Sequence, residues 1–215
     1  MDIYLVRHGE SEANAGLTMD LDSHLTALGK KQAAATAERL ATAGITQAFI
    51  SPFMRTLETA QPICERSQIQ ASLDPLICEY FSARHPEFLT FRGLAPQEIT
   101  KRFPYIAANP SSLCDTEWWP RKHENPDDIY ARAVTVRDRL LQRYGAGDVR
   151  LLYVSHADTV GRLIEAFLRV PPNEPPPWND NCSINLLRVT DDRTAAEVVL
   201  RNDTSHLSQL YADAP

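Results

Sequence analysis

The sequence predicts an α/β fold: a three-layer α/β/α sandwich with a mostly parallel central sheet, helices on both faces and an inserted cap region. Two observations lead to this prediction. Short apolar runs typical of buried strands alternate along the chain with longer segments whose apolar residues recur at helical spacing. Neighbouring parallel strands also need a crossover between them, which is usually a helix, so the alternation indicates a sheet covered on both faces.

Length and composition fit one folded domain. The chain has 215 residues, of which 43% are hydrophobic and 23% charged, and these values argue against the disordered and disulfide-scaffold classes. We expect a single domain over residues 1–215, with a cap inserted at about residues 80–125. The net charge of −6 opposes non-specific attraction to nucleic acid or anionic lipid, so we expect no nucleic-acid or membrane partner.

The sequence indicates neither a membrane span nor a metal site. Apolar runs are short, and Met1 is followed by an acid rather than by an apolar leader segment, which favours the cytoplasm. The cysteines lie too far apart to form a close pair of metal ligands. We expect reduced, mostly buried thiols and no cofactor; the cysteines are Cys64, Cys78, Cys114 and Cys182.

The first expected elements are a strand and a helix. Residues 3–6 form a short apolar run that stops at Arg7-His8-Gly9, where the glycine lets the backbone turn. Thr26 can cap the following helix, and Gly44 can end it. One face of this helix is small enough for close packing, since it carries Gly29, Ala33, Ala37 and Leu40.

A second strand and a second helix follow. Residues 47–50 form the strand, and Ser51 is the expected N-cap of a helix that carries Arg55 in its opening turns. Residues 69–77 make a weaker extended stretch, which is interrupted by a proline and ends just before Glu79.

Between residues 81 and 124 the periodicity fails and prolines recur. We interpret this segment as the inserted cap, with one short helix after Pro96. Two interpretations of its cationic and aromatic side chains stay open: they could hold a second anion or a flat ring, or they could pack a lid and pair with nearby acids. These side chains are Arg84, His85, Arg92, Trp118, Trp119, Arg121, Lys122 and His123.

The rest of the chain continues the alternation. A helix starts at residues 125–128, and the clearest buried strand covers residues 150–154. Asp158 can cap the next helix, although it could instead tune His156. After a proline-rich loop, two terminal strands are expected at residues 183–189 and 195–201.

Reactive side chains share one placement, directly after a predicted strand or at the start of the next helix. In open α/β sheets this edge binds ligands, and helix N-termini there favour a phosphate. Arginines form charge-assisted, often bidentate bonds with phosphate, and a neutral imidazole is a competent nucleophile near pH 7. The placement therefore predicts a metal-free phosphate site with His8 as the nucleophile; the side chains are Arg7, His8, Arg55, Glu79 and His156.

The run Leu5-Val6-Arg7-His8-Gly9-Glu10-Ser11, with Asn14 beyond it, resembles the signature of the histidine phosphatase superfamily, the phosphoglycerate-mutase-like fold, branch 1. Further matches follow in the family's order and extend the resemblance over nearly the whole chain. They are Ser51-Pro52, Arg55-Thr56, Thr59-Ala60, Glu79 and Val154-Ser155-His156.

The resemblance implies a role for each matched residue. His8 accepts the phosphoryl group as a phosphohistidine. Glu79 protonates the departing alkoxide and then, as a base, activates the water that hydrolyses the intermediate. The side chains implied to bind the phosphate oxygens are Arg7, Arg55, His156 and Asn14.

Some assignments stay open. Glu87 or Asp74 could replace Glu79 as the proton donor, and His206 resembles a family feature but is expected to be structural. In the mutase branch an arginine and a Tyr-Gly pair follow the acid, whereas residues 80–82 are Tyr-Phe-Ser here.

We therefore expect a metal-independent phosphomonoester hydrolase that acts on a small phosphorylated metabolite through a phosphohistidine. Two alternatives remain: phosphoryl transfer of the cofactor-dependent phosphoglycerate mutase type, and a non-catalytic module that binds a phosphorylated ligand. The natural substrate and the oligomeric state do not follow from the sequence.

Overall fold

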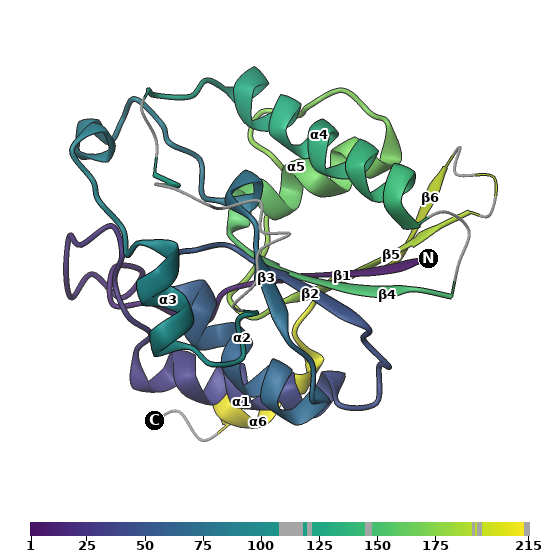
Figure 1. The fold of residues 1–215 in the computed structure, drawn as a ribbon, viewed down its shortest axis with the longest axis horizontal. Helices are drawn as coiled ribbons and strands as arrows, with labels where there is room; N and C mark the ends of the chain where they lie inside the picture. The colour runs from purple at the N-terminus through teal and green to yellow at the C-terminus, as the bar shows by residue number, and fades with distance from the viewer. Residues whose placement is uncertain (108–117, 120–121, 145–147, 191, 193–194, 213–215) are drawn as a thin grey trace.

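A computed structural model of the chain describes residues 1–107, 118–119, 122–144, 148–190, 192 and 195–212 (Figure 1). Cys114 and Arg121, which the sequence analysis singled out, lie outside these residues. In the described part of the chain, no helix is long and apolar enough to cross a membrane.

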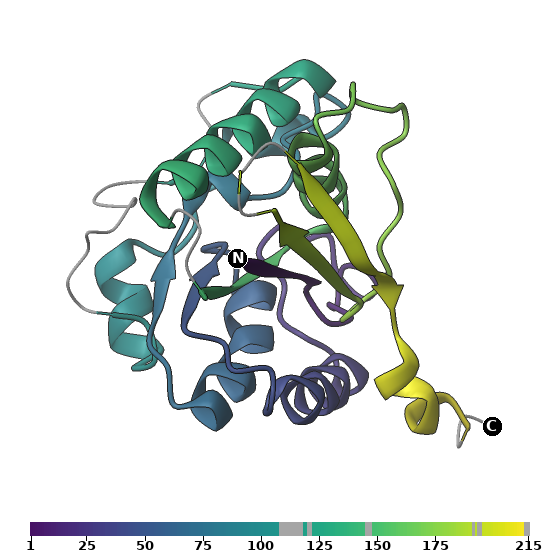
Figure 2. The same cartoon turned by 90° about the vertical axis from the view of Figure 1, so that its right-hand side faces the viewer.

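A six-stranded sheet forms the centre of the molecule, in the order β3-β2-β4-β1-β5-β6. Strand β4 pairs in parallel with both β1 and β2, and β2 pairs in parallel with β3. Strand β5 is antiparallel to β1 and to the edge strand β6 (Figure 2). The strands are β1 (Asp2–Arg7), β2 (Gln47–Ile50), β3 (Ala71–Leu73), β4 (Arg150–Ser155), β5 (Ile184–Val189) and β6 (Ala196–Asp203).

Helices cover both faces of the sheet (Figure 1). The first face carries α1 (Ala27–Leu40), α2 (Met54–Ser67) and the short α6 (Ser208–Ala212). The opposite face carries α4 (Pro126–Tyr144) and α5 (Ala157–Leu168). The prediction of a three-layer sandwich with a mostly parallel sheet is thus confirmed.

Strand β4 contributes side chains to two hydrophobic cores because successive side chains point to opposite faces of the sheet. In β4, Leu152 and Val154 pack with α1 and α2, whereas Leu151 and Tyr153 pack with α4 and α5. All four side chains are fully buried. Burial of a side chain of this size stabilises the fold by about 1.5–3 kcal/mol, so this strand is well anchored from both sides.

The first helix follows the sequence prediction except at its end. Thr26 is the N-cap, and its side chain accepts a hydrogen bond from the Gly29 N–H at 3.0 Å. The expected stop at Gly44 is wrong, because α1 already ends at Leu40. Gly44, with φ of +66°, instead serves the turn that leads into β2.

Two expected helix caps are wrong, and both residues lie at the edge of the sheet where the parallel strands end. Helix α2 begins at Met54 with Phe53 as its N-cap, while the hydroxyl of Ser51 is bonded to His156. Helix α5 has His156 at its N-cap position and Asp158 in its first turn, and no side chain caps it.

The predicted cap contains the expected helix after a proline, α3 (Pro96–Arg102), and a 3-10 turn at Pro86–Leu89. Trp118 and Trp119 are buried, and the Trp118 ring lies 4.8 Å from that of Phe53 in a perpendicular arrangement. The Trp118 indole N–H donates to the Leu94 carbonyl at 2.8 Å. These contacts favour the packing interpretation for both tryptophans.

Candidate active site

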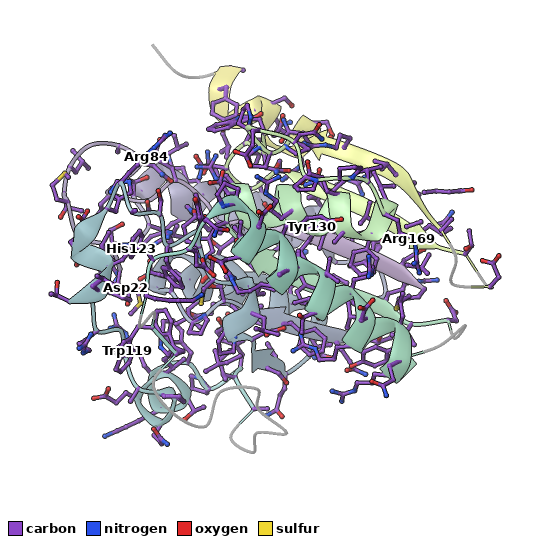
Figure 3. The ribbon with its side chains drawn as sticks, turned by 90° about the horizontal axis from the view of Figure 1, so that it is seen from above. Asp22, Arg84, Trp119, His123, Tyr130 and Arg169 are labelled. Carbon is purple, nitrogen blue, oxygen red and sulfur yellow. The ribbon has the colours of Figure 1, made fainter. Side chains whose placement is uncertain are left out.

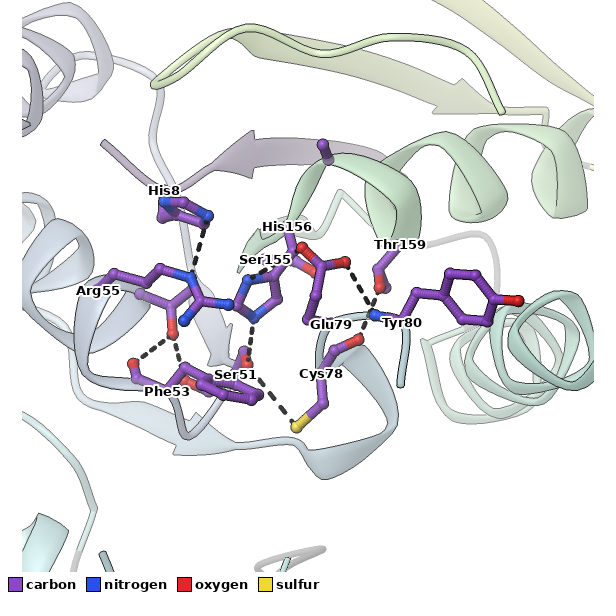
Figure 4. Close-up of polar contacts among 12 residues, drawn as sticks. His8, Ser51, Phe53, Arg55, Cys78, Glu79, Tyr80, Ser155, His156 and Thr159 are labelled. Atoms are coloured by element: carbon purple, nitrogen blue, oxygen red, sulfur yellow. Dashed lines mark hydrogen bonds and ion pairs between the residues drawn. The ribbon is translucent and has the colours of Figure 1, made fainter. Parts of the chain in front are cut away.

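The candidate site lies where the central parallel strands end. His8 follows β1, His156 follows the neighbouring strand β4, and Ser51 follows β2 on the other side of β4. Because parallel strands end at the same edge, residues far apart in sequence meet there. Figure 4 shows His8, Arg55, His156 and Glu79 grouped at this edge.

Hydrogen bonds fix the protonation state of His8. Its Nδ1 lies 2.7 Å from the Gly9 carbonyl oxygen, which only accepts, so Nδ1 carries the proton. The Arg55 Nε–H donates to His8 Nε2 at 3.2 Å, so Nε2 carries a lone pair. Burial, followed by the charges of Arg55 and Arg7, lowers the pKa of His8 well below its usual value. The ring is therefore a neutral imidazole with its nucleophilic nitrogen facing Arg55.

His156 lies beside it, with ring centroids 5.2 Å apart and planes inclined by 64°. Its Nε2 forms a 2.8 Å hydrogen bond with the Ser51 hydroxyl. Its Nδ1 is buried and has no hydrogen-bond partner among the described residues. Burial is also the main cause that lowers the pKa of His156, with Arg55 second. In the tautomer that carries the ring proton on Nδ1, this nitrogen can donate a hydrogen bond to an incoming oxygen atom.

Both arginines are held by carbonyl groups and aromatic rings. Arg55 donates from Nη1 to the Leu21 carbonyl at 2.8 Å, and its guanidinium lies 4.4 Å from the centre of the Phe53 ring. The Arg55 guanidinium is thus oriented before any ligand binds, which reduces the entropy that binding would cost.

Arg7 donates from Nη1 to the Asn179 carbonyl at 2.7 Å and lies 5.3 Å from the ring of Trp178. Its Nε is buried without a partner among the described residues, so a donor remains for a ligand. The loop after α5 thus supplies two contacts to Arg7. Trp178 is 65% exposed although it covers a buried cation, which places it at the rim of the site.

Glu79 completes the group of side chains. Its Oε2 lies 3.8 Å from His156 Nδ1, and its Oε1 accepts from the Tyr80 N–H at 2.9 Å. Burial, and then the negative charge of Asp158, raise the pKa of Glu79. A carboxyl group with a raised pKa is suited to donate a proton near neutral pH.

The two alternative acids are engaged elsewhere. Asp74 is fully buried in an ion pair with Arg139, and Glu87 contacts His85 at 3.1 Å on the surface. Glu79 is therefore the one of these three acids that contacts a site histidine.

Asn14 is linked to the backbone of His8 through Asn181. It is exposed, and its amide oxygen accepts from Asn181 Nδ2 at 3.2 Å, while the same nitrogen of Asn181 donates to the His8 carbonyl at 3.0 Å. The sequence analysis did not include Ser51, Trp178, Asn179 and Asn181 among the site residues. The only signal for the last three was a cluster of aromatic and amide side chains that follows the proline-rich loop.

A cavity of about 590 Å³ opens beside Glu79. Glu79 and Asp158 line one part of it, and Arg84, His85 and Phe88 of the predicted cap line another. Arg84 is exposed on the cap side (Figure 3). The cavity therefore offers space for part of a ligand next to Glu79.

Other cap side chains have different partners. Arg92 lies 6.0 Å from the Trp119 ring, and Lys122 pairs with Asp128 at 3.5 Å. His206 is outside the site as expected, since its Nε2 lies 3.1 Å from the Thr36 hydroxyl on α1. Within the described residues, no group of three or more His, Cys, Asp or Glu side chains could hold a metal ion.

The fold and the site together define a class of protein. Arginines, neutral imidazoles and a carboxyl group at the carboxyl edge of a parallel sheet are the parts of an α/β enzyme that binds phosphate. The sequence profile of the histidine phosphatase superfamily (branch 1) matches residues 3–204. The chain belongs to this superfamily, and it is an enzyme of the histidine phosphatase kind.

Several curated proteins are similar over most of the chain. A protein of Enterobacter sp. named "Probable phosphoglycerate mutase GpmB" is 30% identical over 226 residues, which cover 100% of this chain and 96% of that protein. A glucosyl-3-phosphoglycerate phosphatase of Mycolicibacterium vanbaalenii is 28% identical over 176 residues, covering 79% of this chain and 75% of that protein.

Solved structures share the fold. A mycobacterial glucosyl-3-phosphoglycerate phosphatase, in complex with VO3, aligns with a TM-score of 0.69 at 23% identity and covers 94% of this chain and 99% of its own. The ecdysone phosphate phosphatase of Bombix mori, in complex with tungstate, aligns with a TM-score of 0.74 at 17% identity and covers 94% of this chain and 92% of its own.

Proposed function

We propose that this protein hydrolyses phosphomonoesters of small molecules, without a metal ion, through a phosphohistidine at His8. One observation carries the proposal: the His8 proton is held on Nδ1 by the Gly9 carbonyl, so that Nε2 presents its lone pair beside Arg55. An imidazole fixed in this tautomer is a ready nucleophile, because no proton has to leave before the attack.

In the first step, His8 Nε2 attacks phosphorus and the bond from phosphorus to the ester oxygen breaks. The substrate phosphate replaces His8 as the acceptor of the Arg55 Nε–H. The phosphate-binding side chains are Arg7, Arg55 and His156, with Asn14 at the rim, and they stabilise the charge on the transferring group. Glu79 gives its proton to the departing alkoxide and becomes a carboxylate.

In the second step, water attacks the phosphohistidine. The Glu79 carboxylate takes a proton from the water as its oxygen bonds to phosphorus. The bond from phosphorus to nitrogen breaks, its electron pair returns to His8 Nε2, and inorganic phosphate leaves. Glu79 is again protonated, so one cycle restores both residues.

The compartment and the domain organisation belong to the same proposal. We propose a cytoplasmic protein, because Cys64 and Cys182 are buried free thiols, as expected where thiols stay reduced. We also propose one domain over residues 1–215 in which the cap at about residues 80–125 covers the leaving-group side of the site, since residues 82–88 contribute to the cavity beside Glu79.

The test is hydrolysis of p-nitrophenyl phosphate by the purified protein in the presence of a chelator. We expect turnover, loss of activity in His8→Ala, and an acid-labile phosphoprotein in rapidly quenched wild-type samples. His24→Ala is the matched control, because His24 is partly exposed and pairs with Glu58 rather than with a proposed site residue, so its loss should leave turnover intact. Metal-dependent activity that survives His8→Ala would refute the proposal.

A mutase activity is the second candidate, because relatives that cover nearly the whole chain carry that name. It predicts that isomerisation of phosphoglycerate is faster than its hydrolysis and depends on a bisphosphate primer. A binding module, by contrast, would take up phosphate without forming a phosphoprotein. The isomerisation assay and the search for a phosphoprotein use the same purified protein. Together they distinguish a phosphatase, a mutase and a binding module.

A further inference from the structure

The cavity beside Glu79 contains a carboxylate that the proposed reaction does not use. Asp158 lies in the first turn of α5, two residues after His156, and lines the cavity together with Glu79. The side chain is partly buried and forms no hydrogen bond within the described residues. A carboxylate in this position needs a partner of opposite charge or a hydrogen-bond donor.

The other charged groups of the cavity are mostly paired with one another. Arg162 forms ion pairs with Glu165 at 2.9 Å and with Glu174, and His85 pairs with Glu87. Arg84 has no side-chain partner within the described residues, but it is exposed on the cap side.

Asp158 and Glu79 are close enough to interact. The charge of Asp158 is the second cause, after burial, that raises the pKa of Glu79, while Arg55 and Arg7 act in the opposite direction. Arg162 and Arg7 also act on Asp158, but Arg162 is already paired with Glu165 and Glu174, and Arg7 belongs to the proposed phosphate site. Asp158 is therefore the carboxylate of the cavity that can face a positive charge on the leaving alcohol. An alcohol that leaves from phosphorus must place its oxygen at Glu79, so its next atoms enter the space beside Asp158.

Building on the proposed function, we infer that Asp158 makes the site select phosphate esters whose alcohol carries a positive charge near the ester oxygen, as an amino alcohol does. An ammonium group two or three bonds from that oxygen would face the Asp158 carboxylate. A carboxylate at the same place would be repelled by it. Specificity arises from this difference between attraction and repulsion.

The test compares three esters with the same two-carbon skeleton: O-phosphoethanolamine, ethyl phosphate and phosphoglycolate. For the wild-type protein we expect kcat/KM to be at least about tenfold higher for phosphoethanolamine than for phosphoglycolate, which corresponds to about 1.4 kcal/mol. Ethyl phosphate should lie between them. If turnover of these esters is too slow, their inhibition constants against p-nitrophenyl phosphate give the same comparison. Equal or reversed preference in the wild-type protein would overturn the inference.

Asp158→Asn keeps the shape of the side chain and removes its charge. We expect the ratio of kcat/KM for phosphoethanolamine to kcat/KM for phosphoglycolate to fall about tenfold, toward one. Asp180→Asn is the matched control, because Asp158 and Asp180 both act on the charge of Arg7 but only Asp158 lines the cavity. The ratio should not change in Asp180→Asn. A ratio that survives Asp158→Asn, or that falls equally in both variants, would contradict the assignment to Asp158.

The outcomes separate this inference from the function on which it rests. Hydrolysis of p-nitrophenyl phosphate through His8 without a charge preference would leave the phosphatase proposal intact and overturn the role of Asp158. Absence of hydrolysis of every ester would overturn both. The preference is measured first on the wild-type protein, so it does not depend on whether the variants fold. Thermal unfolding of each variant then shows whether that variant is folded.

Discussion

At the scale of single residues, the contact between Arg55 and His8 controls the state of the proposed nucleophile. The guanidinium donates to the lone pair that would attack phosphorus, and its charge helps to keep the imidazole neutral. In the proposed reaction, a substrate phosphate would offer Arg55 a stronger acceptor and so release the lone pair on binding. In the ligand-free site, Arg55 therefore orients the nucleophile and occupies it at the same time.

Replacing Arg55 by lysine keeps a positive charge but removes the Nε–H and the fork of donors. We expect kcat/KM for p-nitrophenyl phosphate to fall about 10²- to 10³-fold, as when one donor to a developing anion is lost. Steady-state kinetics measure this loss. Arg66→Lys is the control, because Arg66 lies near the end of the same helix in an exposed ion pair with Glu38 and should keep wild-type kinetics. Similar losses in both variants would argue against a role for Arg55 at the phosphate.

Glu79 allows a test based on the leaving group. An alkoxide needs a proton as it departs, whereas p-nitrophenolate leaves without one. In Glu79→Gln we expect kcat/KM, which reports the steps up to release of the alcohol, to fall about 10²- to 10⁴-fold for an alkyl phosphate and much less for p-nitrophenyl phosphate. The water step, which also uses Glu79, is common to both esters and does not enter kcat/KM. Glu87→Gln, a surface carboxylate paired with His85, should affect neither substrate. Equal losses for both esters in Glu79→Gln would mean that this residue is not the proton donor.

Glu79 also affects how kcat/KM depends on pH. Glu79 must be protonated to act as the acid, and its raised pKa moves the alkaline limb of kcat/KM upward. His8 must be neutral to attack, and its lowered pKa moves the acidic limb below its ordinary value of about 6.5. The wild-type profile of kcat/KM for an alkyl phosphate should therefore be a bell, and Glu79→Gln should lose its alkaline limb.

At the scale of elements, the position of α1 determines how the loop after β1 is held. A Cβ atom at Gly29 would lie 2.0 Å from the Glu10 carbonyl oxygen, and one at Gly9 would lie 2.7 Å from the Gly29 carbonyl oxygen. The helix and the loop thus touch through their backbones. The Gly9 carbonyl that fixes His8 belongs to this contact region, which links helix packing to the proposed chemistry.

Gly29→Ala should therefore affect both stability and activity. The added methyl group has to push α1 and the loop apart, which typically costs about 1–3 kcal/mol of unfolding free energy, and the displaced carbonyl should lower kcat as well. Denaturant unfolding and kinetics measure the two effects. Ala34→Gly exchanges the same two residue types on the exposed side of α1 and should cost about 0.5–1 kcal/mol without a change in kcat. Wild-type kcat in Gly29→Ala would show that the loop position does not matter.

The individual elements show what local sequence can predict and what it cannot. The four central strands were predictable, because buried runs of apolar residues between turn signals have few other uses. Ser51 and Asp158 were wrongly predicted as helix caps. A hydroxyl or a carboxylate just before a helix is equally suited to cap the helix and to contact the site, so the sequence does not distinguish the two roles. The role depends on which distant part of the chain lies nearby in the fold: His156 lies beside Ser51, and the cavity lies beside Asp158.

At the scale of the whole molecule, the alternation of elements was enough to predict three layers, and the family motifs placed His8, Arg55 and His156 at one edge. The order of the strands was not predictable, since β4 inserts between β1 and β2 although it follows both in the chain. The contacts of Trp178 and Asn179 with Arg7 were not predictable either, because they depend on where a loop between two elements returns.

The buried histidines also affect global stability. Their pKa values are lowered in the folded protein, whereas an unfolded histidine has a pKa of about 6.5. As the pH falls through about 6.5, the unfolded chain binds protons that the folded site excludes, so the free energy of unfolding decreases.

His8→Gln removes one of these groups, so its Tm should fall less than that of the wild-type protein between about pH 8 and about pH 5.5. Thermal unfolding followed by circular dichroism measures this difference, and carboxyl groups that titrate in the same window contribute to both proteins. His85→Gln, on the surface, should follow the wild-type curve. An unchanged pH dependence in His8→Gln would mean that His8 is not kept neutral by the fold.

The insertion of β4 between β1 and β2 has a consequence for the newly made chain. Strands β1 and β2 leave the ribosome before β4, yet each pairs with β4 rather than with the other. The sheet cannot close until residues 150–155 have been synthesised, and closing such long loops slows folding. A nascent chain in which β4 has not yet been made therefore carries His8 and Arg55 without the strand that lies between β1 and β2, and the side chains of the candidate site come together only after β4 has been added.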